Sequence, residues 1–160
     1  MPYGKRRDRD AVILLAKGYD EGFVNQCVGE LREAGIDTDL VGLESRYITS
    51  LHGVGIQADE VLRNWNPTEK TRLIVVPGGA ECVTALAREP KVPELVRRVL
   101  SQDGWVAVEQ SAESTLERQK EIMLPDQHIL PPDIVNGHYL SQGNERTDDF
   151  IRSLIQRILP

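Results

Sequence analysis

Three short apolar runs, each ended by a sharp turn and followed by a helical pattern, most constrain the fold. They are AVILLAK (Ala11–Lys17), RLIVVPGG (Arg72–Gly79) and WVAVEQ (Trp105–Gln110). Their length and their β-branched residues are typical of strands that are buried on both faces. Because helical patterns separate them, we expect a parallel sheet with helices on both of its faces.

The stretches between these runs support that expectation. A stripe of apolar residues from Phe23 to Ala34 predicts a helix that ends at Gly35. We further expect the elements that follow: a strand at Asp37–Glu44, a hairpin and a turn within Ile48–Leu62, helices from Cys82, from Pro90–Pro93 and from Gln110 to Lys120, short strands in HILPP (128–132) and GHYLSQG (137–143), and a last helix capped by Thr147. The predicted fold class is α/β: a doubly wound, mostly parallel sheet with helices on both faces.

The 160 residues fit a single domain, and residues 1–9 are expected to form a flexible, solvated tail. A formal net charge of −6 argues against a nucleic-acid partner. The apolar run at Ala11–Ala16 is too short for a signal core or a membrane span, so we expect no membrane partner. Two cysteines, Cys27 and Cys82, form no disulfide framework and favour a cytoplasmic protein with reduced thiols. The sequence has no cluster of His, Cys and Asp residues at metal-ligand spacing and no phosphate-binding loop of the Walker or dinucleotide type. We therefore expect neither a metal nor a cofactor.

Ligands of such sheets bind beyond the carboxyl ends of the strands. Three stretches of this chain follow predicted strand ends: Gly18–Phe23, Pro77–Cys82 and Glu109–Ala112. The functional residues are therefore expected to come from these three stretches.

The order and spacing of these pieces resemble the ThiJ/PfpI family, the DJ-one-like branch of the class I glutamine amidotransferase-like superfamily. The resemblance covers residues 10–118 and rests on VILLAKGYDEGF, on GIDTDLVGLESRYITSLHGVGIQADEVL and on LIVVPGGAECVTAL. It implies a flavodoxin-like fold and a homodimer. It also implies an enzyme site made of a cysteine on a strained strand-to-helix elbow, a glutamate from the first loop, and an oxyanion hole of backbone N–H groups.

The site residues carry over only in part. Gly78-Gly79 match the oxyanion-hole loop, but counting along the helix from Leu116 puts Gln110 where the family has cysteine. Phe23 falls where the family has glutamate; Asp20 and Glu21 lie nearby but at a different step. Ser111 stands where protease-like members have histidine. The residues expected to line a pocket are Glu21, Phe23, Gly78, Gly79, Gln110 and Ser111.

Three other residues could carry chemistry at this edge of the sheet. Glu109 is either an acid/base or ligand-binding carboxylate, or a strand-end residue that reaches solvent or a positive neighbour. Cys82 is either a displaced nucleophile in a first helical turn or a packing residue. Ser111 would need a base, and His52, His128 and His138 are all distant in sequence.

Cys27 is expected to pack in the core. Glu21 is either a first-turn acid that favours the helix dipole or a pocket residue.

The favoured hypothesis is a domain without cysteine-dependent catalysis that acts as a binding, stress-related or assembly module. The alternative is a divergent hydrolase, peptidase, glyoxalase or deglycase that uses Cys82, Glu109 or Ser111 beside Gly78-Gly79. A flavodoxin-like nucleotide binder is a third possibility, but the chain shows no phosphate-binding signature for it.

Overall fold

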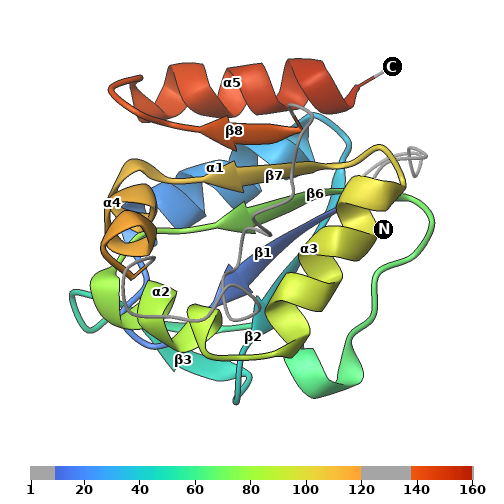
Figure 1. Ribbon diagram of the computed structural model, residues 1–160. Helices are drawn as coiled ribbons and strands as arrows, with labels where there is room; N and C mark the ends of the chain where they lie inside the picture. Colours follow the sequence, from blue (N-terminus) through green and yellow to red (C-terminus); the bar gives the residue numbers. More distant parts are fainter. Residues whose placement is uncertain (1–9, 120–137, 160) are drawn as a thin grey trace.

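The computed structural model describes residues 10–119 and 138–159. Six strands form one sheet in the order β5-β2-β1-β6-β7-β8, and every pair in it is parallel (Figure 1). In chain order these strands are β1 (Asp10–Leu15), β2 (Asp37–Gly42), β5 (Glu60–Val61), β6 (Thr71–Val76), β7 (Trp105–Val108) and β8 (Tyr139–Ser141). A separate antiparallel hairpin contains β3 (Tyr47–Thr49) and β4 (Gly55–Gln57).

Helices cover both faces of this sheet, as predicted. One face carries α1 (Glu21–Glu33) and α5 (Thr147–Ile158); the other carries α2 (Ala80–Ala87) and α3 (Lys91–Ser101). The helix α4 (Gln110–Gln119) packs against α2 at the end of β7.

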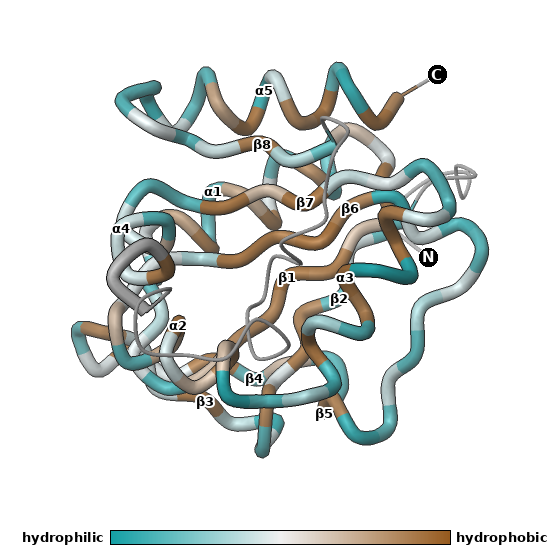
Figure 2. The backbone as a smooth tube through the Cα atoms, viewed as in Figure 1, coloured by the Kyte–Doolittle hydropathy of each residue, from teal (hydrophilic) through white to brown (hydrophobic). Residues whose placement is uncertain are grey.

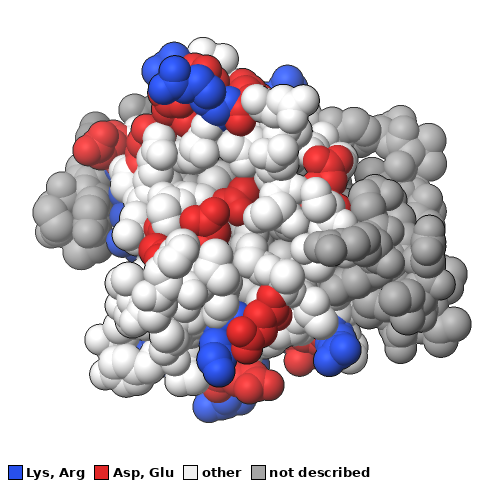
Figure 3. Space-filling view, turned by 90° about the vertical axis from the view of Figure 1, so that its left-hand side faces the viewer, with Lys and Arg blue, Asp and Glu red and all other residues white. Residues whose placement is uncertain are grey.

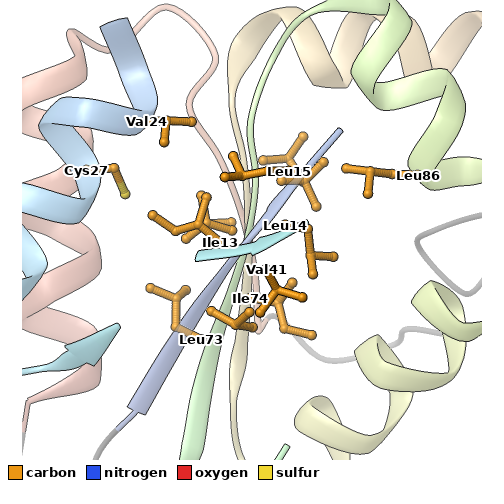
Figure 4. Packing of buried hydrophobic residues seen from close by; sticks show 14 of the residues in the cluster. Ile13, Leu14, Leu15, Val24, Cys27, Val41, Leu73, Ile74 and Leu86 are labelled. Atoms are coloured by element: carbon orange, nitrogen blue, oxygen red, sulfur yellow. The ribbon is translucent and has the colours of Figure 1, made fainter. Parts of the chain in front are cut away.

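The core consists of aliphatic side chains that alternate between these two layers. Ile13 points toward α1, whereas its neighbour Leu14 points toward the opposite layer, where Leu86 of α2 lies (Figure 4). All three side chains are almost completely buried. The central strands are therefore apolar over most of their length (Figure 2), because a parallel sheet with two covered faces exposes neither set of side chains.

Several boundaries differ from those expected from the sequence. The strand at Trp105 ends at Val108, so Glu109 lies outside it, and α2 begins at Ala80 rather than at Cys82. Thr147 is not a cap: it is the first helical residue, and Arg146 precedes it without a capping side chain. The expected strand HILPP lies outside the described residues, as do the tail 1–9 and His128.

Within the described ranges, none of the helices combines the length and the apolar content that a membrane crossing requires.

The order of the strands in the sheet reverses between β1 and β6. From β1 the chain moves outward to β2, then returns to the other side of β1 to form β6. The carboxyl ends of β1 and β6 therefore meet at a topological switch point, where ligands of doubly wound folds bind. The loops that follow these two strands, together with the turn after β7, form the candidate site.

Candidate functional site

The loops after β1 and β6 are in direct backbone contact. Gly79 has φ +99°, and a Cβ built there would lie 2.0 Å from the carbonyl oxygen of Gly18. Only glycine fits this combination of dihedral and closeness. The N–H of Asp20 donates to the Gly78 carbonyl at 3.1 Å. The two loops thus have a fixed relative position.

Glu109 occupies the turn between β7 and α4 and faces inward. Its N–H donates to the Val76 carbonyl at 3.1 Å, which continues the sheet by one residue. The residue is only 5% exposed. Its Oε2 accepts a hydrogen bond of 2.8 Å from the Ser111 hydroxyl. A Cβ at Gly78 would lie 1.7 Å from this same oxygen, so the carboxyl group occupies the space that the glycine leaves open.

This environment favours the neutral form of the Glu109 carboxyl group. Burial, and to a smaller extent the Asp20 carboxylate, raise its pKa, whereas the Ser111 hydroxyl and the Gly78 backbone lower it; the resulting pKa is about 8. No ion pair to Glu109 occurs within the described part of the chain. The simpler expectation, that Glu109 reaches solvent or a positive neighbour, is wrong. A carboxylic acid with a pKa near 8 is neutral at pH 7 and can donate a hydrogen bond.

Asp20 is the acidic residue that accompanies Glu109, and the sequence did not single it out. It is the N-cap of α1, where its Oδ1 accepts from the Phe23 N–H at 3.2 Å. An aspartate three residues before a buried helical position is the usual capping signal. That signal explains the local hydrogen bond but says nothing of the contact with a second carboxyl group across the sheet edge.

Gln110 is exposed at the first position of α4, beside the inward-facing Glu109. Its backbone N–H donates to Oε1 of Gln142 at 3.2 Å. Gln142, only 8% exposed, also donates through Nε2 to the Glu145 carbonyl and the Thr147 hydroxyl, both at 3.1 Å. The first amide of α4 is thus satisfied by a side chain that follows β8. The sequence offered no signal for this contact, because Gln142 lies in the irregular tail.

The turn after β7 lacks the backbone strain that the family resemblance implies. Among the described residues other than glycine, only Asp103 has a positive φ, at +66°. The backbone from Glu109 to Ser111 therefore avoids the left-handed region. A side chain at this turn gains its position from packing and hydrogen bonds rather than from a strained elbow.

Both cysteine side chains are buried. Cys27 packs in the core as expected, and burial raises its pKa above the ordinary range of a thiol. Cys82 lies in the first turn of α2, yet burial raises its pKa to about 12. A reactive cysteine needs access and a lowered pKa. The structure gives Cys82 neither, so it fits the packing alternative.

Two further candidates lie away from Glu109. Phe23 is buried in the core, its ring centroid 6.3 Å from that of Phe150, and does not line an opening at the edge. Glu21 faces the hairpin, where its Oε1 is 2.7 Å from Nδ1 of His52. Hydrogen bonding to its own backbone amide, and then to His52, lowers the pKa of Glu21. His138 stacks on Trp105, the first residue of β7, so it lies at the opposite edge of the sheet.

An open pocket of about 400 Å³ lies at the carboxyl edge of the sheet, over the ends of β1 and β2. Its floor contains apolar residues such as Ala16, Leu43 and Ile48. Lys17 and Glu81, 3.9 Å apart, stand at its rim. This edge therefore offers both a hollow and a set of polar groups.

The family follows from comparison with known proteins. The model of the DJ-1/PfpI family matches residues 9–120, more than half of the chain. The chain belongs to the DJ-1/PfpI family. The match contains β1, the glycine loop after β6 and the turn after β7, so the predicted family is confirmed. A search of curated proteins finds no match.

Solved structures of the family share the fold. A cysteine-to-alanine mutant of a DJ-1 superfamily protein from Salmonella typhimurium is 23% identical, with a TM-score of 0.73, over 93% of this chain and 89% of that one. DJ-1beta from Drosophila melanogaster is 20% identical, with a TM-score of 0.74, over 94% and 90%. DJ-1 from Schizosaccharomyces pombe is 15% identical, with a TM-score of 0.72, over 94% and 92%. These likenesses confirm the predicted flavodoxin-like fold.

Proposed function

We propose that this DJ-1/PfpI-family chain binds a small molecule at the carboxyl edge of β1, β6 and β7, without cysteine-dependent catalysis. The observation that carries this proposal is the occupant of the turn after β7: a buried carboxylic acid, Glu109, held by Ser111. A carboxyl group in this place offers its oxygens and its proton to a polar group of a ligand, and it is not a nucleophilic thiolate.

The backbone groups of the turn support binding over acyl-transfer catalysis. An oxyanion hole needs N–H groups that are free to meet the developing charge. Here the Gln110 N–H already donates to Gln142, and the Gly78 backbone interacts with Glu109. These internal contacts engage the backbone groups that an oxyanion hole would need. A role in stress responses and a cytoplasmic location belong to the same proposal; two free cysteines favour a reducing compartment.

Thiol labelling of the native protein tests the proposal most simply. We expect both thiols to react with a disulfide reagent only after denaturation, because both are buried. A Cys27→Ala/Cys82→Ala variant should show the same ligand-induced thermal shifts as the unmodified chain. Rapid labelling of one native thiol, together with loss of esterase or glyoxalase turnover in that variant, would contradict the proposal.

A second function, a divergent hydrolase, is favoured by one contact. The Ser111 hydroxyl is exposed, and the 2.8 Å hydrogen bond joins it to a carboxyl group that could accept its proton above pH 8. Esterase turnover that rises between pH 7 and 9 and vanishes in both Ser111→Ala and Glu109→Gln would establish it. Turnover that persists in Ser111→Ala would exclude it.

We also propose a homodimer, as the family resemblance implies. In the described residues, the exposed large apolar side chains are Tyr47, Leu51 and Val54, all of which belong to the β3–β4 hairpin. Such a group of apolar side chains is typical of an interaction surface. Light scattering should give twice the chain mass at micromolar concentration and the single mass for Leu51→Lys; a monomeric unmodified chain would contradict this.

A further inference from the structure

Two carboxyl groups from distant parts of the chain meet around Gly78. Asp20 donates its N–H to the Gly78 carbonyl at 3.1 Å, and Oε2 of Glu109 fills the space where a Cβ of Gly78 would lie. The two acids interact directly, since Asp20 contributes to the titration of Glu109. Neither acid forms an ion pair in the part of the chain that the structure describes. The fold has therefore placed two acids together without a cation.

One oxygen of this pair lacks a hydrogen-bond partner. Glu109 as a whole is only 5% exposed. Its Oε1 is buried and accepts no hydrogen bond from the described groups. A buried acceptor without a donor costs free energy. Two things satisfy such an oxygen: a proton on the carboxyl group itself, shared toward Asp20, or a donor supplied by a ligand.

The surroundings exclude most ligand classes. The first amide of α4 donates to Gln142 and is therefore not available to an anion. A divalent metal would need more ligands than this pair, and no group of three suitable side chains occurs in the described residues. Figure 3 shows this face of the molecule, with acidic side chains near its middle surrounded mainly by uncharged ones, and with lysine and arginine toward its margins. A positively charged hydrogen-bond donor fits best.

We propose that Asp20 and Glu109 bind the protonated amino group of a small molecule, which replaces the proton that the pair otherwise holds. The ammonium group has three N–H donors and no acceptor. It donates to one oxygen of each carboxylate, and Glu109 releases its proton to solvent. Asp20 is half-buried and Ser111 is exposed, so the residues that flank Glu109 reach the surface. This inference names the ligand class of the proposed function and rests on it.

The other titratable groups around the pair do not supply the missing charge. Cys27 of α1 and Cys82 of α2 face Glu109, and burial raises the pKa of each. Tyr19 lies in the loop after β1, and burial likewise raises its pKa. All three are therefore neutral at pH 7. Glu21 is an acid paired with His52. None of these described groups supplies a positive charge, and the proposed ligand does.

The test is a carbon-13 NMR titration of the Glu109 carboxyl group with n-propylammonium chloride, with sodium chloride and tetramethylammonium chloride at equal concentration as references. Propylammonium should lower the apparent pKa of Glu109 by at least one unit, and calorimetry at pH 7 in two buffers should show proton release. Tetramethylammonium, which has no N–H donor, should do neither. Equal effects of the two organic cations, or no effect of either, would overturn the proposal.

Variants locate the site. Glu109→Gln and Asp20→Asn should each weaken propylammonium binding at least tenfold; asparagine keeps the cap of α1, so the second variant retains the fold. Glu94→Gln, an exposed acid of α3, is the control and should bind as the unmodified chain does. Unchanged binding in Glu109→Gln would contradict the assignment. Thiol labelling is independent of this titration, so the ligand class and the absence of thiol chemistry can fail separately.

Discussion

The turns that follow β6 and β7 at the carboxyl edge of the sheet are built in opposite ways. The turn after β6 is made of backbone: Gly79 has a positive φ and lies against the Gly18 carbonyl. The turn after β7 is made of side chains: Glu109 is buried and held by Ser111, while Gln142 caps the helix that follows. The first is fixed by steric contacts between main chains. The second depends on residues from three parts of the chain and can change its chemistry by substitution.

The largest effect is expected from a side chain in the backbone turn. Gly79→Ala would combine an unfavourable φ with a contact of 2.0 Å to a carbonyl oxygen. We expect a loss of about 4 kcal/mol in the free energy of unfolding, measured by denaturant titration. No second substitution should restore it, because the contact is with backbone. Gly29→Ala is the control: its Cβ would meet nothing within 4 Å, so stability should be kept or raised. A mild effect at Gly79 would contradict this view of the turn.

Gly78→Ala separates the two turns more finely. Its Cβ would meet Oε2 of Glu109 at 1.7 Å and the Ser111 hydroxyl at 1.9 Å, which are side-chain atoms. The expected loss is about 3 kcal/mol. Unlike Gly79→Ala, it should be partly reversed when Glu109→Ala is added, as a double-mutant cycle would measure. Strict additivity of the two losses would show that Glu109 does not occupy this space.

A substitution of Gln142, which lies directly after β8, tests how this residue supports the turn after β7. Gln142→Leu would leave the Gln110 N–H without its acceptor and remove two further hydrogen bonds. We expect a loss of about 2 kcal/mol and faster hydrogen exchange at Gln110. Gln102→Leu is the control, since Gln102 also donates to two carbonyls but lies away from the edge. Unchanged exchange at Gln110 in Gln142→Leu would show that this amide does not depend on Gln142.

Glu109 makes the stability of the side-chain turn depend on pH. Its pKa is raised in the fold, so between the unfolded value of about 4.3 and about 8 the folded state holds a proton that the unfolded state has lost. Stability should therefore fall as pH rises through this window, on the order of 1 kcal/mol per unit at most, and then level off. Glu109→Gln, which cannot titrate, should remove this part of the slope. An identical slope in the variant would exclude Glu109 as its source.

The sequence predicted the backbone turn well and the side-chain turn only in outline. Pro77-Gly78-Gly79 after an apolar run indicates a tight strand-to-helix loop, because glycine is required where φ is positive. The apolar stripe from Phe23 likewise predicted α1, whose buried face the structure confirms. Such features depend on neighbours along the chain, and periodicity reveals them.

The residues of the side-chain turn could not be assigned in the same way. Sequence showed Glu109 as an unusual acid at a strand end but not its surroundings, because Asp20 approaches Glu109, and Gln142 approaches Gln110, only in the folded sheet. The count from Leu116 emphasised Gln110, whereas the side chain that faces inward belongs to Glu109. A shift of one residue at the end of a strand moves a side chain from the interior to the surface.

A direct titration of the Glu109 carboxyl group tests the central claim, that a neutral buried acid occupies the turn after β7. Carbon-13 NMR of glutamate-labelled protein, assigned by comparison with Glu109→Gln, would follow this group from pH 4 to pH 10. We predict a midpoint near 8, far above that of an exposed glutamate. A midpoint below 5 would show that Glu109 is an ordinary carboxylate at neutral pH. That result would contradict both the neutral state of the Glu109 carboxyl group and the release of its proton when an amine binds.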